Sequence, residues 1–98
     1  MRLQVEFSDR AEADLEGVAD YIALDNPKRA VSFVRELRAR CERIAGQPRA
    51  NRLREELGPG TRGAVHGPHL ILYTERRGVL VIERIVHGAR DLGRLLDE

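Results

Sequence analysis

Apolar and polar residues alternate at the start of the chain. Leu3, Val5 and Phe7 are each separated by one polar residue. A period of two places these three side chains on one face of an extended strand. The pattern therefore predicts a short strand over residues 3–7 with one buried face.

The spacing of apolar residues then becomes helical. Asp9 followed by Glu12 matches a capping box, in which each side chain binds free backbone N–H groups at a helix start. The apolar positions that follow recur at helical spacing: Ala11, Leu15, Val18 and Ile22. This stripe predicts a helix over residues 9–24 with one face toward a core.

A second helix is predicted from Pro27 to Gly46. Asn26 can cap its start, and Pro27 suits the first helical position because the amide hydrogen that proline lacks has no partner there. Its apolar stripe consists of Ala30, Phe33, Val34, Leu37, Cys41 and Ile44. The turn between the two helices is so short that they are expected to lie antiparallel, as a helical hairpin.

The second half of the chain changes character. Residues 47–60 contain little apolar content and several glycines and prolines, which predicts a loop. Three strands are then predicted at 61–66, 69–75 and 79–87, joined by gaps of hairpin length. The last is apolar on both faces, which favours a central place in the sheet. Residues 89–96 offer a final helical turn or two.

The predicted order is strand, helix, helix and three strands. This order indicates an α+β fold, in which an antiparallel sheet ending in a three-stranded meander carries the helical hairpin on one face. With 98 residues, the chain is expected to form a single domain over 1–98 with one modest core.

Composition excludes several classes of protein. The only cysteine, Cys41, permits no internal disulfide and no metal cage built on several thiolates, and its place on an apolar stripe predicts a packing role. No apolar stretch approaches the roughly 20 residues that span a membrane, and no signal peptide is apparent. Gly58-Pro59-Gly60 neither follows a strand nor opens a helix, so no nucleotide cofactor is expected. We expect a cytoplasmic protein without cofactor or membrane contact.

The net charge of +1 hides a strong ordering along the chain. Residues 27–54 carry nine basic and two acidic side chains, a net charge of +7, whereas residues 1–26 carry a net charge of −5. Such a basic block suggests a surface that meets nucleic acid or an acidic protein segment. It is equally consistent with two neighbouring helices that pair their charges across a shared surface.

Histidines are the first candidates for chemistry. His66 and His69 flank a Gly-Pro turn with no carboxylate or cysteine beside them, so exposed turn histidines are favoured over a metal site. His87 closes the last predicted strand between Arg84 and Arg90. A histidine there can serve as a general acid or base or can bond a backbone carbonyl, and the structural role is favoured.

Arginines are the second group of candidates for chemistry. Arg62, Arg84 and Arg90 could clamp a phosphate bidentately or could pair with nearby acids such as Glu83 and Asp91. Their spacing is equally consistent with a phosphate clamp and with ion pairs within the fold.

Several short strings occur together in a fixed order: SDRAEADL from Ser8, DYIA from Asp20, Asn26-Pro27 with Ala30, Pro48, Arg62, LILYTE around Tyr73, and ERIVHGARDL from Glu83 to Leu92. With these strings the chain resembles the RelE/ParE superfamily of bacterial type II toxins, and the ParE branch in particular. The resemblance covers nearly the whole chain, and ERIVHGARDL is its most specific part.

This resemblance implies a toxin bound by a ParD-like antitoxin in a hetero-oligomer that contacts DNA only through the antitoxin. ParE-like toxins, associated with plasmid stabilisation, inhibit DNA gyrase by protein binding and need no catalytic residue. The alternative is a ribosome-dependent mRNA endoribonuclease of the RelE branch, with Arg62, Arg84 and His87 as catalytic residues. Several ribonuclease relatives carry an aromatic residue directly after the last strand, where this chain has Gly88-Ala89-Arg90, which favours the ParE branch. A non-toxic relative that only regulates its operon is a third possibility.

Two interaction surfaces are expected on this basis. The basic block is expected to meet an acidic antitoxin segment, and the proposed antitoxin contacts are Arg35, Arg38, Arg52 and Tyr73. The end of the chain is expected to meet the target, through Arg84, His87, Arg90, Leu95 and Leu96.

Overall fold

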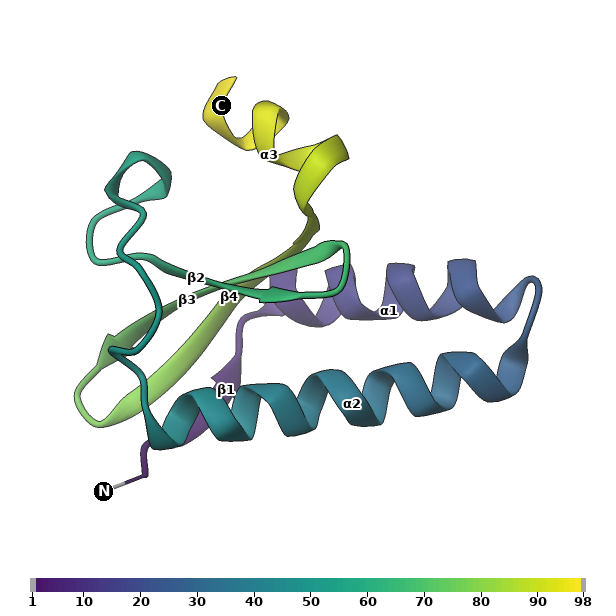
Figure 1. Cartoon of the computed structure of the whole chain (residues 1–98), viewed down its shortest axis with the longest axis horizontal. Coiled ribbons are helices and arrows are strands. Elements are labelled where there is room, and N and C mark those ends of the chain that lie inside the picture. The colour runs from purple at the N-terminus through teal and green to yellow at the C-terminus, as the bar shows by residue number, and fades with distance from the viewer. Residues whose placement is uncertain (1, 98) are drawn as a thin grey trace.

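The computed structural model describes residues 2–97, and the side chains of residues 2–94 (Figure 1). Its elements follow the predicted order: β1 (Gln4–Phe7), α1 (Asp9–Ala23), α2 (Pro27–Gly46), the 3₁₀ helix η1 (Glu55–Leu57), β2 (Arg62–His66), β3 (His69–Arg76), β4 (Val79–His87) and α3 (Gly88–Asp97). The α+β fold and the helical hairpin are thus confirmed. None of the helices in the described part is long and apolar enough to cross a membrane.

The sheet has the strand order β1-β4-β3-β2, so β4 is central, as its two apolar faces predicted. The meander β2-β3-β4 is antiparallel, but β1 lies parallel to β4, with Gln4 opposite Val79 and Phe7 opposite Ile82. The expectation of a wholly antiparallel sheet is therefore wrong for β1. The helical hairpin returns the chain to the end of the sheet at which β1 begins, because the Leu3 N–H donates to the Ala45 carbonyl near the end of α2 at 3.0 Å. The meander's first and third strands then run in the direction of β1.

The main core lies between the sheet and the helical hairpin. Figure 1 shows α1 and α2 side by side along one face of the sheet and extending beyond it at their connecting turn. Leu37 and Cys41 of α2 meet Ile71 of β3 with Leu80 and Ile82 of β4, and all five are fully buried. Burial also raises the pKa of Cys41 to about 11. The predicted packing role of this thiol is confirmed.

The other face of the sheet carries a smaller apolar cluster. Leu70, Leu72 and Val86 are buried there beneath Leu57 of η1 and Leu92 of α3. Because these two elements cover the face, part of the predicted loop is ordered, and the predicted final turns form a helix of ten residues.

Tyr73 attaches the segment after α2 to the sheet. Its side chain is 1% exposed, and its hydroxyl donates to the Pro48 carbonyl at 2.7 Å and accepts from Asn51 Nδ2 at 3.2 Å. Burial raises the pKa of the phenol. A side chain this buried offers no surface to a partner, so the expected antitoxin contact through Tyr73 is corrected to a role in the fold.

The substitution Tyr73→Phe removes this hydroxyl and leaves the Pro48 carbonyl without its donor. We expect the free energy of unfolding to fall by about 1–2 kcal/mol, measured by urea denaturation. Tyr21 is 72% exposed, so Tyr21→Phe is the matched control and should leave stability unchanged within about 0.5 kcal/mol. Equal stability of the two variants would contradict the role given to Tyr73.

Candidate functional site

Strand β4 bends at Glu83, where its pairing with β3 is interrupted. The register to β3 shifts between Ile82 and Arg84, so Glu83 is the extra residue of a β-bulge. The pairing of β1 with β4 ends at the same point, with Phe7 opposite Ile82. Beyond the bulge, the outer edge of β4 has no neighbouring strand in the described part of the chain.

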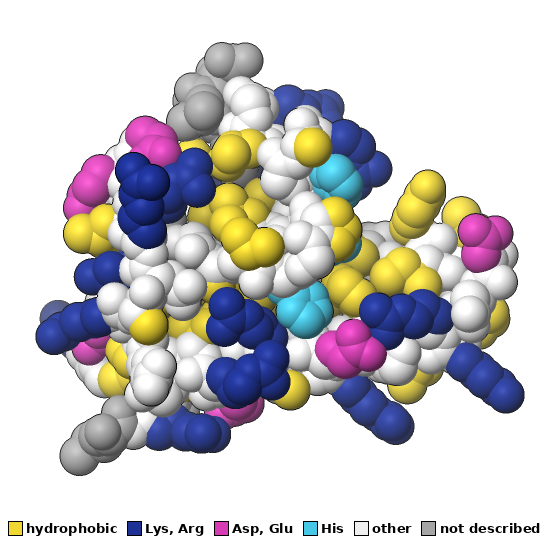
Figure 2. Space-filling model, in the orientation of Figure 1, with side chains coloured by type: hydrophobic (Ala, Val, Ile, Leu, Met, Phe, Trp, Pro, Cys, Tyr) yellow, Lys and Arg dark blue, Asp and Glu magenta, His cyan; other side chains and the backbone are white. Residues whose placement is uncertain are grey.

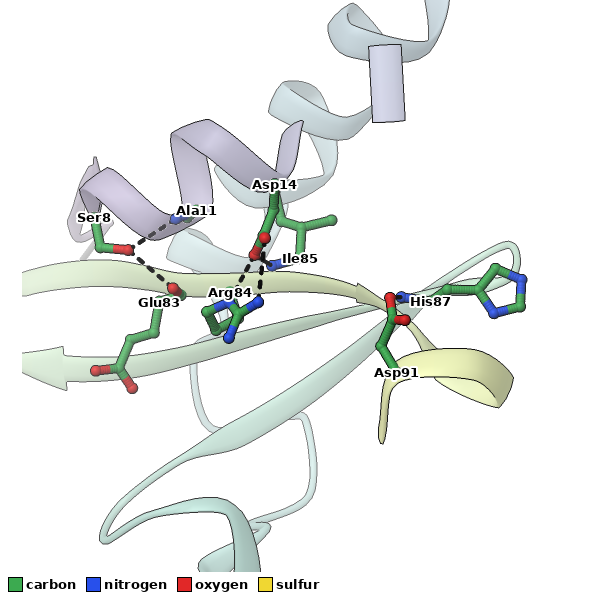
Figure 3. Close-up of polar contacts among 8 residues, drawn as sticks. All are labelled: Ser8, Ala11, Asp14, Glu83, Arg84, Ile85, His87 and Asp91. Carbon is green, nitrogen blue, oxygen red and sulfur yellow. Dashed lines mark hydrogen bonds and ion pairs between the residues drawn. The ribbon is translucent and has the colours of Figure 1, made fainter. Parts of the chain in front are cut away.

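The start of α1 covers the first part of this open edge. The Ser8 N–H donates to the Ile82 carbonyl at 2.9 Å, and its hydroxyl donates to the Glu83 carbonyl at 2.9 Å (Figure 3). The same hydroxyl accepts from the Ala11 N–H at 3.0 Å, which makes Ser8 the N-cap of α1. The predicted cap at Asp9 is therefore displaced by one residue, because Ser8 satisfies the helix and the strand together.

Asp14, one turn further along α1, covers the next part of the edge. Its Oδ2 accepts from Arg84 Nε at 2.8 Å and from the Ile85 N–H at 2.9 Å, and its Oδ1 accepts from Arg84 Nη2 at 3.2 Å (Figure 3). The two side chains are only 22% and 19% exposed. Arg84 is thus held by a bidentate, charge-assisted contact within the fold.

His87 joins β4 to α3. Its Nδ1 accepts from the Arg90 N–H at 3.1 Å, while Asp91 Oδ2 accepts from the His87 N–H at 3.0 Å. This is a reciprocal cap with a histidine in place of the usual serine or threonine. His87 thus has the favoured structural role, but its backbone partner is an amide N–H and not the carbonyl that was expected.

Three histidines form a row across the end of the sheet. His66, His69 and His87 lie opposite one another on β2, β3 and β4. The His69 ring lies 5.4 Å from the Phe33 ring and 5.8 Å from the His87 ring, measured between centroids, and the His66 ring lies 6.0 Å from Phe33. The expectation that His66 and His69 are simply exposed in a turn is wrong, since both are partly buried against α2. Within residues 2–97, no group of three or more ligating side chains is placed to hold a metal ion.

The three residues considered for ribonuclease chemistry do not converge. Arg62 lies opposite Tyr73, and its Nη1 donates to the Asn51 carbonyl at 2.6 Å. His87 lies opposite His69, four positions from Tyr73 along β3, which corresponds to about 13 Å. Arg84 points to Asp14 instead of toward either of them. Each of the three side chains serves a different local contact.

A groove of about 740 Å³ lies between the overhanging hairpin and this end of the sheet. Apolar side chains from the helices line it, together with His69, His87, Arg90 and Asp91. Of the expected target-binding residues, the structure brings His87 and Arg90 together here, whereas Arg84 is engaged on α1. Leu95 and Leu96 belong to α3, but their side chains lie outside the described part.

Over residues 5–92, the sequence matches the profile of the family described as the ParE toxin of the type II toxin-antitoxin system parDE. The chain belongs to this toxin family. Among solved structures it is similar to a chromosomal ParDE toxin-antitoxin system from P. aeruginosa, with a TM-score of 0.76 and 18% identity over 88% of this chain and 96% of that one. It is also similar to the toxin-antitoxin complex RelBE2 from Mycobacterium tuberculosis, with a TM-score of 0.60 and 25% identity over 89% and 99%. No curated protein matches it significantly.

The basic block of this ParE-family chain is divided among several surfaces. Arg38 pairs with Glu12 of α1 at 3.4 Å, and its guanidinium lies 4.8 Å from the centre of the Phe7 ring. This contact is the charge pairing between neighbouring helices that the sequence left open. Arg35 is exposed on α2, and Arg52 lies beside the start of β2, where its carbonyl accepts from the Gly63 N–H. The predicted antitoxin contacts therefore do not form one patch.

The sequence analysis missed Asp14, although a signal for it exists. Asp14 follows Ala11 by three residues and precedes Val18 by four, so a carboxylate stands on the buried stripe of the first helix. A charged residue at such a position requires a partner in the fold. The structure identifies that partner as Arg84 with the Ile85 N–H.

The histidine row predicts an acid-sensitive fold. Burial, followed by the nearby charge of His87, lowers the pKa of His69 below its ordinary value of 6.5. The unfolded chain therefore binds this proton at a higher pH than the folded chain does. Stability is expected to fall as the pH drops below about 6.5 toward the folded pKa. Denaturation series at pH 7.5 and 5 should show a smaller decrease for His69→Phe, and an equal decrease would contradict this account.

Proposed function

We propose that this ParE-family toxin inhibits DNA gyrase by binding to it, and that a ParD-like antitoxin neutralises the toxin. Family membership supports the toxin role. The antitoxin partner is supported by the two structural neighbours, which are described as a ParDE toxin-antitoxin system and a RelBE2 toxin-antitoxin complex. The proposal places the chain in the cytoplasm, where gyrase acts, with DNA contacted only through the antitoxin.

The observation that favours binding over RNA cleavage is the separation of Arg62, Arg84 and His87. Cleavage through a ribose 2′-hydroxyl needs a base, an acid and a phosphate stabiliser within hydrogen-bond reach of one phosphate. In this fold the Asn51 carbonyl holds Arg62, Asp14 holds Arg84, and the His87 Nδ1 caps α3. Recruiting all three would require breaking contacts that the fold uses.

The surface proposed for the target is the groove wall that carries Arg90. The backbone N–H of Arg90 is held by the His87 ring, whereas the Arg90 side chain lines the groove. This side chain has no ion-pair partner among the described residues. Arg77, in the turn between β3 and β4, is also exposed, but it lies at the opposite end of β4. The two arginines provide a matched pair of substitutions.

The test is a supercoiling assay with purified gyrase, beside a reconstituted translation reaction that contains no gyrase. We expect the wild-type chain to inhibit supercoiling and to leave the messenger RNA intact. Arg90→Glu should weaken inhibition of gyrase by about tenfold, the loss of about 1.4 kcal/mol, whereas Arg77→Glu should behave as wild type.

The opposite pattern would contradict the proposal. Cleavage of the message by a chain that leaves gyrase unaffected would assign it to the ribonuclease alternative. A chain inactive in both reactions that still binds an antitoxin would indicate the regulatory relative.

A further inference from the structure

The end of α1 that projects beyond the sheet carries exposed apolar side chains. Leu24 is 82% exposed and Tyr21 is 72% exposed, the two highest values among the large apolar residues of the described chain. Figure 1 shows this end of the hairpin clear of the sheet. Apolar residues exposed side by side mark an interaction surface more often than residues scattered singly do. We call residues 20–25 the hairpin end.

The hairpin end is also acidic. Asp20 and Asp25 flank the two apolar residues, and α1 has no basic residue in its last turn. Neither carboxylate has an ion-pair partner among the described residues. The hairpin end therefore presents apolar surface with two unpaired carboxylates beside it.

The groove between the hairpin and the end of the sheet has the complementary chemistry. Val18, Ile22 and Phe33 line it with apolar surface, and Arg90 lines it from α3. Figure 2 shows apolar side chains open to view along the overhanging hairpin, next to a histidine. An apolar segment with negative charge beside it fits such a groove, because Arg90 can pair with the charge.

The groove also has room for incoming side chains. Its volume of about 740 Å³ falls within the range of pockets that enclose a drug-sized ligand, about 300–1,000 Å³. Gly17 lines it from α1, and a Cβ built at this glycine would meet nothing within 4 Å. Tyr21 borders the groove of its own chain but remains mostly exposed, so it does not fill the space.

We propose that two copies of the toxin form a dimer in which the hairpin end of each copy enters the groove of the other. The apolar side chains of the hairpin end then pack against the groove lining, and its carboxylates meet Arg90 of the second copy. Tyrosine and arginine are the residues that most often dominate the binding energy of protein interfaces.

The symmetry of such a dimer favours a second copy as the occupant. A two-fold interface requires one patch that is complementary to itself. Here the groove and the hairpin end are continuous, since Tyr21 belongs to both, so one rotation brings both pairs of complementary surfaces together. An interface built from one groove and one helix end is small, which predicts a dissociation constant in the micromolar range.

The dimer has a consequence for the target. Arg90 lines the groove, so a copy whose groove is filled cannot present this side chain to gyrase. This consequence rests on the proposed function, whereas the dimer itself does not. The monomer is then the inhibitory form, and the dimer is a resting form in which the apolar groove is covered.

The test is sedimentation velocity of the toxin over a range of concentrations that spans the micromolar range. Leu24→Glu places a charge on the hairpin end and leaves the groove intact. Val65→Glu is the matched control, because Val65 is 67% exposed but projects from the face of the sheet opposite the helices. We expect Leu24→Glu to raise the dissociation constant of the dimer at least tenfold, and Val65→Glu to change it by less than about twofold.

A second variant tests the groove. Gly17→Arg fills the groove from its own chain, and arginine is a better helix former than glycine, so the fold is not put at risk. We expect this variant to remain monomeric where the wild type is dimeric. Arg90→Glu should also weaken the dimer about tenfold, whereas Arg77→Glu should not.

Three results would overturn the dimer. They are a wild-type chain that stays monomeric throughout the concentration range, dimers of Leu24→Glu and Gly17→Arg as strong as those of wild type, and a monomeric wild type whose two variants instead lose affinity for the antitoxin. The last result would assign the groove to the antitoxin.

Supercoiling assays separate this inference from the proposed function. Leu24→Glu keeps Arg90 and should inhibit gyrase at least as well as wild type. If the wild-type chain inhibits gyrase but never dimerises, only the dimer fails. If it dimerises through the groove but leaves gyrase unaffected, only the proposed function fails.

Discussion

The contact between Asp14 and β4 joins the helical layer of this toxin to its sheet. Strand β1 covers β4 only as far as Ile82, so the backbone beyond the bulge needs another partner. Asp14 supplies one, because a single carboxylate accepts the Ile85 N–H and both nitrogens of the Arg84 fork. The helix thereby replaces a missing strand along this edge. The position of α1, and of the groove that it overhangs, depends on this contact.

The same contact bears on what the molecule can do. A guanidinium held by two hydrogen bonds and 22% exposed is part of the architecture, and freeing it would leave Asp14 partly buried and unpaired. With Arg84 assigned to the fold, the groove wall with Arg90 is the surface that we propose for the target.

Local periodicity predicted most of the fold. The periodic patterns predict the bounds of β1 to β4, α1 and α2 to within one or two residues. They do so because burial on one face dictates the spacing of apolar residues. Local periodicity did not predict the tertiary contacts. The alternation of Leu80 and Ile82 would place Arg84 toward the core, but the bulge at Glu83 shifts the pattern and turns Ile85 inward instead. The direction of β1 depends on where the hairpin returns the chain, which no local pattern encodes.

The site was predicted less completely for the same reason. His87 and Arg90 are three residues apart in the sequence and also meet in the structure. Arg62 would join them only if the strand pairing brought it to the same end of the sheet, and the register excludes that. The row of three histidines depends on the pairing of three strands. Only that pairing places His66 and His69 opposite each other and beside His87.

The most direct test of this account is a double-mutant cycle between Asp14 and Arg84, using Asp14→Ala, Arg84→Ala and the double variant. The free energy of unfolding of each is measured by urea denaturation. The account predicts a coupling energy of about 2 kcal/mol, since the two side chains act as one unit. Additive effects within about 0.5 kcal/mol would contradict it, and would free Arg84 for a role at the surface.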